Sequence, residues 1–215
     1  MKKGDFVYIS YIGRLESGEI FDLTDEETAK KEKILNTNMK YSPVPVIVGE
    51  KFIIPGIDEA LLEMKIGDEK ELTIEPEKGF GKRDSKLLKV FPKSMFKNDV
   101  KAGMVVDMGG MPGRIQSVEA GRVRVDFNNP MAGKVLRYKI KVEKKVEKDD
   151  EKVKAFFEYF SIKPEISVKE NELEIISAIP QQLRKRASEI IFKYTKIEKI
   201  KFIEVCEKGE KAKDI

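Results

Sequence analysis

Few side chains in this sequence can do covalent chemistry. Its 215 residues include no histidine and one cysteine, Cys206. The lack of histidine excludes serine–histidine and cysteine–histidine nucleophiles and histidine metal sites. Cys206 falls in a predicted strand near the C-terminal end, where a buried, inert thiol is the better interpretation. Gly109, Gly110 and Gly113 lack the Lys-Ser/Thr pair of a phosphate-binding loop. We therefore expect no metal and no cofactor, and aromatic and aliphatic side chains remain as candidates.

The segment 46–81 organises these side chains. Residues 46–48 predict an apolar strand, and Pro55-Gly56 mark a turn after a short apolar loop. A short helix follows, because four apolar residues recur at helical spacing: Ile57, Ala60, Leu61 and Met64. Residues 71–75 then alternate as a strand. An apolar loop that leads into a helix across a sheet predicts an aliphatic pocket, although periodicity alone fits an ordinary core better.

The N-terminal strand supplies the register that favours a site. Residues 4–15 alternate, with Tyr11 on the same face as Val7 and Ile9. From here the chain resembles the FKBP family of peptidyl-prolyl isomerases in a long ordered series: Tyr11-Ile12-Gly13-Arg14-Leu15, Gly18, Phe21-Asp22, Val48-Gly49, Ile54-Pro55-Gly56-Ile57, Ala60-Leu61, Met64, Gly67-Asp68, Ile74, Pro76 and Phe80-Gly81. Residues 128–136 resemble the family's Asn-His-Pro-Leu-Ala-Gly-x-x-Leu stretch, with Asn129 in place of the usual histidine.

This resemblance implies an enzyme that accelerates rotation about X-Pro bonds. The barrier is roughly 18–20 kcal/mol, because the amide loses its resonance when it twists. No bond is made, so no nucleophile is required. An apolar slot that removes water from the amide helps, since the twisted amide is less polar and loses less on desolvation. The implied partners are unfolded or partly folded polypeptides that contain proline.

By resemblance, the catalytic site combines aromatic, aliphatic and acidic residues: Tyr11, Phe21, Asp22, Ile53, Ile54, Ile57, Phe80 and Tyr138. Val44 is expected to add to substrate binding. The proline ring would lie over Phe21, Ile57 and Tyr138. Ile57 stands where single-domain members often have tryptophan, and Val44 where they have a larger aromatic residue. The floor of the site should therefore be shallower, which disfavours tight binding of drug-like ligands more than turnover.

The polar edge of the site is also implied by the resemblance. Tyr11 and Asp22 would orient it, and Phe80 with the Ile54 backbone would hold the peptide. Taken singly, each apolar residue fits plain core packing better. Only their joint register favours a binding site.

A change in the sequence pattern, to short strands separated by turns, marks an inserted β module at 85–127. Short strands are predicted at 104–108, 114–118 and 122–127, after a proline turn and a one-turn helix at 91–96. In position and size the module is similar to the insert of SlyD-type FKBP proteins, which replaces the flap over the active site and binds unfolded chain. Six residues could offer an adaptable apolar surface for substrate: Met104, Met108, Met111, Ile115, Val118 and Met131.

These boundaries predict an α+β protein of three domains. An FKBP-like antiparallel sheet wrapped on a short helix spans 1–84 plus 128–147, and a C-terminal α+β domain spans 148–215. This last domain reads as helix, strand, strand, helix and strand. Its small size suggests a homodimer through it. Within the first domain, Thr24 with Glu27 fits a capped surface helix at 25–33, although a solvated loop is the better interpretation of this polar segment. The arrangement resembles the long, archaeal-type form of the family.

Composition adds weaker constraints. Lys+Arg number 42 and Asp+Glu 38, a net charge of +4, so nothing demands a nucleic-acid or membrane partner. One cysteine cannot form an internal disulfide, which favours a reducing compartment. The N-terminus has no apolar targeting segment, and no run reaches membrane-spanning length. We expect a cytoplasmic protein.

Two other functions remain open. The chain could be a non-catalytic holdase or assembly chaperone whose isomerase domain is a relic. It could also be a ribosome- or RNA-associated factor that binds through basic residues: Lys93, Lys97, Arg122, Arg124 and the cluster 184–186. The cluster 184–186 is otherwise interpreted as a solvated helix face. The small net charge makes this the weakest hypothesis.

Overall fold

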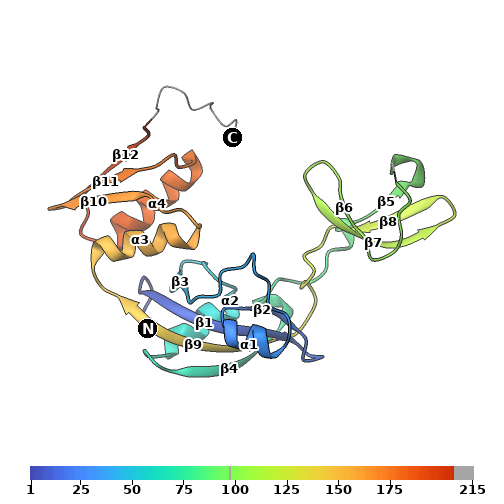
Figure 1. The fold of residues 1–215 in the computed structure, drawn as a ribbon, viewed down its shortest axis with the longest axis horizontal. Helices are drawn as coiled ribbons and strands as arrows, with labels where there is room; N and C mark the ends of the chain where they lie inside the picture. The colour runs from blue at the N-terminus through green and yellow to red at the C-terminus, as the bar shows by residue number, and fades with distance from the viewer. Residues whose placement is uncertain (97, 206–215) are drawn as a thin grey trace. The chain divides into compact units, whose positions relative to one another are not determined.

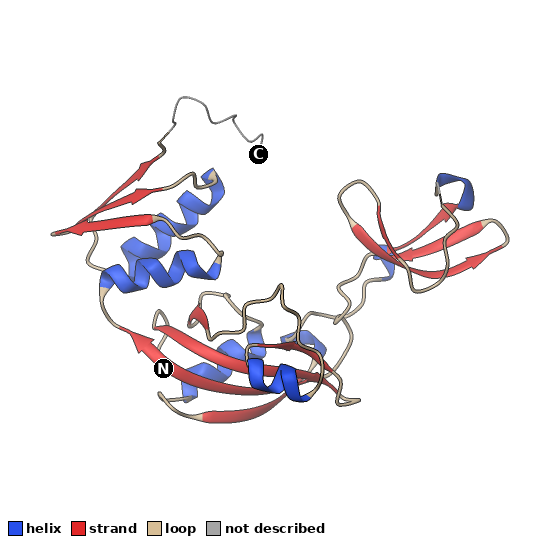
Figure 2. Cartoon of the chain, viewed as in Figure 1, coloured by secondary structure: helices blue, strands red, loops and turns tan. Residues whose placement is uncertain are grey.

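The computed structural model describes residues 1–96 and 98–205. Cys206 and Lys97 lie outside the described residues. The chain forms two compact units, one of residues 1–72 with 137–215 and one of residues 73–136. Figure 1 labels the elements, and Figure 2 distinguishes helices from strands.

The first sheet is the antiparallel sheet expected from the sequence. Its strand order is β2-β1-β9-β4, and β3 also pairs with β1: β1 (Phe6–Leu15), β2 (Ile20–Leu23), β3 (Val44–Ile47), β4 (Glu69–Ile74) and β9 (Leu136–Val146). Both β2 and β3 pair with β1 in antiparallel register, at opposite ends of that long strand. Because β3 covers the first half of β1 and β2 the second half, the edge of β1 is paired along most of its length.

Two helices belong to this part of the chain, α1 (Glu26–Lys31) and α2 (Pro55–Glu63). The apolar stripe predicted for α2 is buried at Ile57, Ala60 and Leu61. Pro55 begins the helix, where its missing N–H costs nothing. The cap predicted for α1 is wrong by one residue. Asp25 is the N-cap and accepts from the Thr28 N–H at 2.7 Å, which leaves Thr24 free for another role.

The C-terminal part has the predicted order of helix, strand, strand, helix and strand. Its elements are α3 (Asp149–Tyr159), β10 (Glu165–Lys169), β11 (Glu172–Ile176), α4 (Gln181–Tyr194) and β12 (Lys199–Ile203). β11 pairs antiparallel with β10 and parallel with β12. Val153, Phe156 and Phe157 of α3 are buried at the predicted helical spacing. Pro180 is the N-cap of α4 rather than its first helical residue.

The second unit contains a four-stranded antiparallel sheet of order β5-β8-β7-β6. Its strands are β5 (Leu88–Pro92), β6 (Val105–Asp107), β7 (Pro112–Glu119) and β8 (Arg122–Asp126), with 3-10 turns η1 (Pro76–Lys78), η2 (Ser85–Leu87) and η3 (Lys93–Met95). Three of the strands were predicted, and β5 was not. Pro92 signalled a turn, but β5 lies at the edge of the sheet, where a proline at the last position is tolerated.

None of the helices in the described part of the chain is both long and apolar enough to cross a membrane.

Candidate active site

Three aromatic side chains meet on the first sheet. The Tyr138 ring of β9 lies 5.6 Å from the Phe21 ring of β2 and 5.9 Å from the Tyr11 ring of β1, measured between ring centroids. Both pairs are edge-to-face, the arrangement that ring quadrupoles favour. We call Tyr11, Phe21 and Tyr138 the aromatic cluster. It unites three predicted site residues that are far apart in sequence.

Gly13 makes room for the aromatic cluster. It pairs with Asp22 across β1 and β2. A Cβ atom at Gly13 would lie 2.9 Å from Phe21 Cζ and 3.0 Å from Tyr138 Cε1, closer than carbon atoms normally approach. Glycine at this strand position therefore allows both rings to lie against the backbone of β1.

A partly buried polar contact borders the aromatic cluster. The Tyr11 hydroxyl donates a hydrogen bond to Asp22 Oδ2 at 3.1 Å. Burial raises the pKa of Asp22, although the hydrogen bonds from Tyr11 and the Leu23 N–H act in the opposite direction. Burial, followed by the Asp22 charge, raises the pKa of Tyr11 and of Tyr138 well above the ordinary tyrosine value. Both tyrosines therefore stay protonated at neutral pH and can act as hydrogen-bond donors.

Thr24 fixes the backbone of Tyr11, a role that the sequence analysis missed. The Tyr11 N–H donates to Thr24 Oγ1 at 2.8 Å, and the Thr24 N–H donates to the Tyr11 carbonyl at 3.0 Å. The Thr24 side chain is buried. Its sequence signal resembled a helix cap, since Ser/Thr followed by Glu at the third position fits both situations.

The aliphatic residues predicted for the site come from β3 and from the start of α2. Ile57 is 0% exposed in the first turn of α2, and Ile53 and Ile54 are half-buried in the preceding loop. Val44 begins β3 and pairs with Ile9 of β1. The Ile54 carbonyl accepts from the Ile57 and Asp58 N–H groups of α2. Only the Ile54 N–H, and not its carbonyl, is thus suited to hold a bound peptide.

Phe80 belongs to the second unit. It lies in the turn closed by the Gly81 N–H, which donates to the Pro76 carbonyl at 2.7 Å, and its side chain is 36% exposed.

The six apolar residues predicted for substrate capture differ in exposure. Met104 and Met111 are 46% and 52% exposed, and Met108, Val118 and Met131 are half-buried. Ile115 cannot be part of an accessible surface, because it is 1% exposed in the core of the four-stranded sheet with Val100, Val123 and Val125. The Ile115 side chain lies on the inner face of β7. The predicted strand 114–118 was too short for its alternation to show which side chains face the core.

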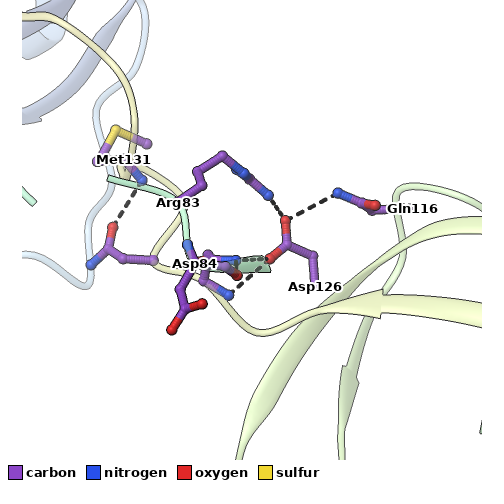
Figure 3. A network of polar contacts seen from close by, with 7 residues as sticks. Arg83, Asp84, Gln116, Asp126 and Met131 are labelled. Carbon is purple, nitrogen blue, oxygen red and sulfur yellow. Dashed lines mark hydrogen bonds and ion pairs between the residues drawn. The ribbon is translucent and has the colours of Figure 1, made fainter. Parts of the chain in front are cut away.

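A polar network ties together the two segments that lead into the four-stranded sheet (Figure 3). Asp126 pairs with Arg83, accepts from Gln116 Nε2 at 3.2 Å, and accepts from Asn128 at 2.8 and 2.9 Å. Asn128 and the Asp84 backbone exchange two hydrogen bonds of 2.8 and 3.0 Å. Asn129, where histidine was expected, closes a local turn by accepting from the Met131 N–H at 2.8 Å. The sequence pattern contained Asn128 and Asn129, but not their partners.

The basic residues considered for RNA binding are engaged within the chain in part. Lys93 pairs with Asp99 at 3.0 Å. Arg184 donates to the Ile179 carbonyl at 2.6 Å, and Arg186 donates to the Glu50 carbonyl at 3.3 Å. The cluster 184–186 is therefore not simply a solvated helix face.

The antiparallel sheet, its short helix and the aromatic cluster define an α+β protein with an apolar candidate site and no nucleophile in it. Comparison with known families supports a definite assignment. The family model described as FKBP-type peptidyl-prolyl cis-trans isomerase matches residues 1–102, and the model described as FKBP26, IF domain, matches residues 91–131.

Individual relatives agree with the family models. The chain is 41% identical over 145 residues to a short-type peptidyl-prolyl cis-trans isomerase of Methanocaldococcus jannaschii, covering 66% of this chain and 92% of that protein. It is 32% identical over 115 residues to the SlyD isomerase of Helicobacter pylori, covering 51% and 62%. The chain belongs to the FKBP-type peptidyl-prolyl cis-trans isomerases. It is an enzyme of that class.

Proposed function

We propose that this protein accelerates cis-trans isomerisation of X-Pro bonds in folding polypeptides, with the aromatic cluster as the proline site. The observation that carries the proposal is the meeting of Tyr11, Phe21 and Tyr138 beside the half-buried Asp22, in a chain of this enzyme family. In this assignment Phe21 and Tyr138 contact the proline ring. Ile57 is 0% exposed, so it belongs to the core beneath the site rather than to the contact surface. A contact of Phe80 with substrate stays a prediction from the sequence.

The catalytic effect follows from the apolar character of the cluster. A twisted amide has lost its resonance and is less polar than a planar one, so it is disfavoured less by removal from water. The cluster therefore stabilises the twisted form relative to the planar form without any covalent step. The Ile54 N–H is the donor available to a flanking carbonyl group, because the Tyr11 hydroxyl already donates to Asp22. It fixes the peptide rather than changes its chemistry.

The test of this site is the isomerisation of a short X-Pro peptide without a coupled protease. Phe21→Ala and Tyr138→Ala are each expected to lower kcat/KM about tenfold or more, which corresponds to roughly 1.4 kcal/mol of lost transition-state stabilisation. Leu62→Ala is the matched control, because Leu62 is an apolar residue of α2 that is 46% exposed. Unchanged kcat/KM in both site variants would show that the proline site lies elsewhere.

We further propose that the β module captures unfolded chain and so gives the enzyme chaperone activity. The support is a set of large apolar side chains that are exposed on the module: Val90 (57%), Met95 (58%), Met104 (46%), Val105 (65%) and Met111 (52%). Methionine side chains adapt to varied apolar partners. Such a surface suits transient binding of many sequences rather than one tight partner.

A full-length variant can test the capture surface. Replacing Met95, Met104, Val105 and Met111 by serine is expected to abolish suppression of aggregation and to leave isomerisation of a short peptide unchanged. Serine replacement of three exposed apolar residues in the first unit, Ile34, Leu35 and Leu62, is the control. Aggregation suppression that survives the first variant would contradict the proposed surface.

A holdase without isomerase activity is the second candidate, since the same exposed side chains would serve it. Absence of peptide isomerisation with retained aggregation suppression would favour it. Location in the cytoplasm and a homodimer through residues 148–215 stay predictions from the sequence.

A further inference from the structure

The loop between β3 and α2 links the C-terminal domain to the proposed proline site. Residues 48–54 form this loop, and Ile53 and Ile54 at its end lead directly into the buried Ile57. Two of its residues, Glu50 and Phe52, contact α3 and α4. α3 also lies against β3, the strand that precedes the loop.

Phe52 packs among three aromatic rings at the C-terminal end of α3. It is 4% exposed, and its ring centroid lies 4.8 Å from that of Tyr159, 6.0 Å from Phe156 and 6.2 Å from Phe160. The Tyr159 hydroxyl donates a hydrogen bond to the Phe52 carbonyl. The Arg186 guanidinium of α4 lies 5.1 Å from the centre of the Phe52 ring, within the range of a cation–π contact. Both the side chain and the backbone of Phe52 are therefore held by the C-terminal domain.

Glu50 provides a second attachment, to α4. Its carboxylate pairs with Lys193 at 2.8 Å and accepts a hydrogen bond from the Tyr194 hydroxyl, and its carbonyl accepts from Arg186 at 3.3 Å. Burial disfavours the charged form of Glu50, yet the hydrogen bonds from Lys193 and Tyr194 leave its pKa below the ordinary value. Glu50 and Phe52, the two neighbours of Lys51, are thus attached to the same domain.

The end of α3 also contacts β1 and the segment that precedes β3. Glu158 accepts from the Tyr8 hydroxyl at 2.6 Å and pairs with Lys40 at 3.5 Å. α3 is therefore attached to the loop through Tyr159 and to β1 through Glu158.

We propose that the C-terminal domain is a positioning element of the isomerase, in which Tyr159 and Arg186 hold Phe52 and so fix Ile53 and Ile54 for peptide binding. This inference rests on the proposed proline site. Tyr159 is a positioning residue, since its hydroxyl acts on the Phe52 backbone rather than on substrate. Holding the loop in one conformation removes the cost of ordering it when a peptide binds.

The expected kinetic effect separates positioning from plain stabilisation. The Ile54 N–H would hold the planar and the twisted peptide equally, so loosening it should raise KM and leave kcat unchanged. A loss of folded protein would instead lower the apparent kcat at constant KM.

Tyr159→Phe is the decisive variant, because it removes the hydroxyl and keeps the ring against Phe52. We expect KM for an X-Pro peptide to rise about three- to tenfold at unchanged kcat, the range for one lost hydrogen bond. Tyr8→Phe is the matched control. It removes another tyrosine hydroxyl that bonds to α3, but not one attached to the loop, and both constants should stay as in the wild type.

Amide hydrogen exchange provides a readout that is independent of activity. Tyr159→Phe should speed exchange at Ile57 and Asp58, whose N–H groups donate to the Ile54 carbonyl, and Tyr8→Phe should not. Faster exchange with a raised KM supports the inference. Unchanged KM and exchange in Tyr159→Phe, or a lower kcat at unchanged KM, would overturn it. Failure of the proposed function would be seen separately, as a wild-type protein without isomerase activity or a Phe21→Ala variant with full activity.

Discussion

Adding one methyl group at Gly13 should impair the proline site while the fold persists. The Cβ of an alanine would lie 2.9 Å from Phe21 Cζ and 3.0 Å from Tyr138 Cε1. Carbon atoms pack best at roughly 3.5–4.0 Å, so each ring has to move by about 0.5 Å. A misplacement of about 1 Å in an active site can cost a hundredfold in rate, so Gly13→Ala should lower kcat/KM about tenfold.

The stability of Gly13→Ala should change little. Overpacking costs about 1 kcal/mol at its lower limit, and both rings can yield at their far ends. Replacing glycine by alanine in a strand returns about 0.5–1 kcal/mol through the unfolded chain, and Gly13 does not have a positive φ angle that would oppose the change. The free energy of unfolding, measured in urea, should therefore stay within about 1 kcal/mol of the wild type.

Gly113→Ala is the matched control for overpacking outside the proposed site. Its Cβ would lie 2.5 Å from Val125 Cγ1 and 2.8 Å from Phe127 Cε1, in the core of the four-stranded sheet. It should destabilise that sheet and leave isomerisation of a short peptide intact. Peptide isomerisation at the wild-type rate in Gly13→Ala would refute the assignment of Phe21 and Tyr138 to the proline ring.

Three further predictions concern groups that are buried or half-buried. Burial raises the pKa of Asp22, so the stability contributed by this carboxyl falls as pH rises through its folded-state pKa. Asp22→Asn should therefore raise the Tm at pH 7. The variant should lose this advantage below about pH 3.9, where the carboxyl is protonated in the folded and the unfolded state. Asp126→Ala should destabilise the second unit by about 2 kcal/mol, which hydrogen exchange of β7 and β8 would measure. The cost is smaller than for a fully buried pair, because Arg83 is 42% exposed. Ile115→Ala should cost about 3 kcal/mol in urea unfolding by leaving a cavity.

The sequence predicted those parts of the fold in which local patterns agree with tertiary packing. The stripe of α2 and the order of elements from α3 to β12 follow from periodicity and turn residues alone. β5 was missed because Pro92 was interpreted without knowing that the strand lies at a sheet edge. Edge position is a property of the assembled sheet, and no local pattern encodes it.

The aromatic cluster shows a similar division. Tyr11, Phe21 and Tyr138 were proposed from a resemblance in register, and their rings do lie together. The roles of Thr24 and Tyr159 could not be predicted from local patterns. Thr24 bonds to the backbone of Tyr11 instead of capping the helix that follows it. Tyr159 bonds to the backbone of Phe52, which is distant in sequence. Hydrogen bonds from side chains to distant backbone leave no pattern in a single sequence.

The two segments that flank the β module permit a direct test of a separate capture function. Asp84 and Asn128 are hydrogen-bonded to each other, so a chain that lacks residues 85–127 can be joined there without stretching. The shortened chain keeps the aromatic cluster and loses the exposed apolar side chains of the module.

The most direct test is protease-free isomerisation kinetics with the full chain and this deletion variant, on a short X-Pro peptide and on a protein whose refolding is limited by proline. We predict that both chains accelerate the peptide reaction, and that the deletion loses far more activity on the protein substrate. If the full chain accelerates neither reaction and still suppresses aggregation, the protein is not an isomerase acting through the aromatic cluster, and its function is that of a holdase.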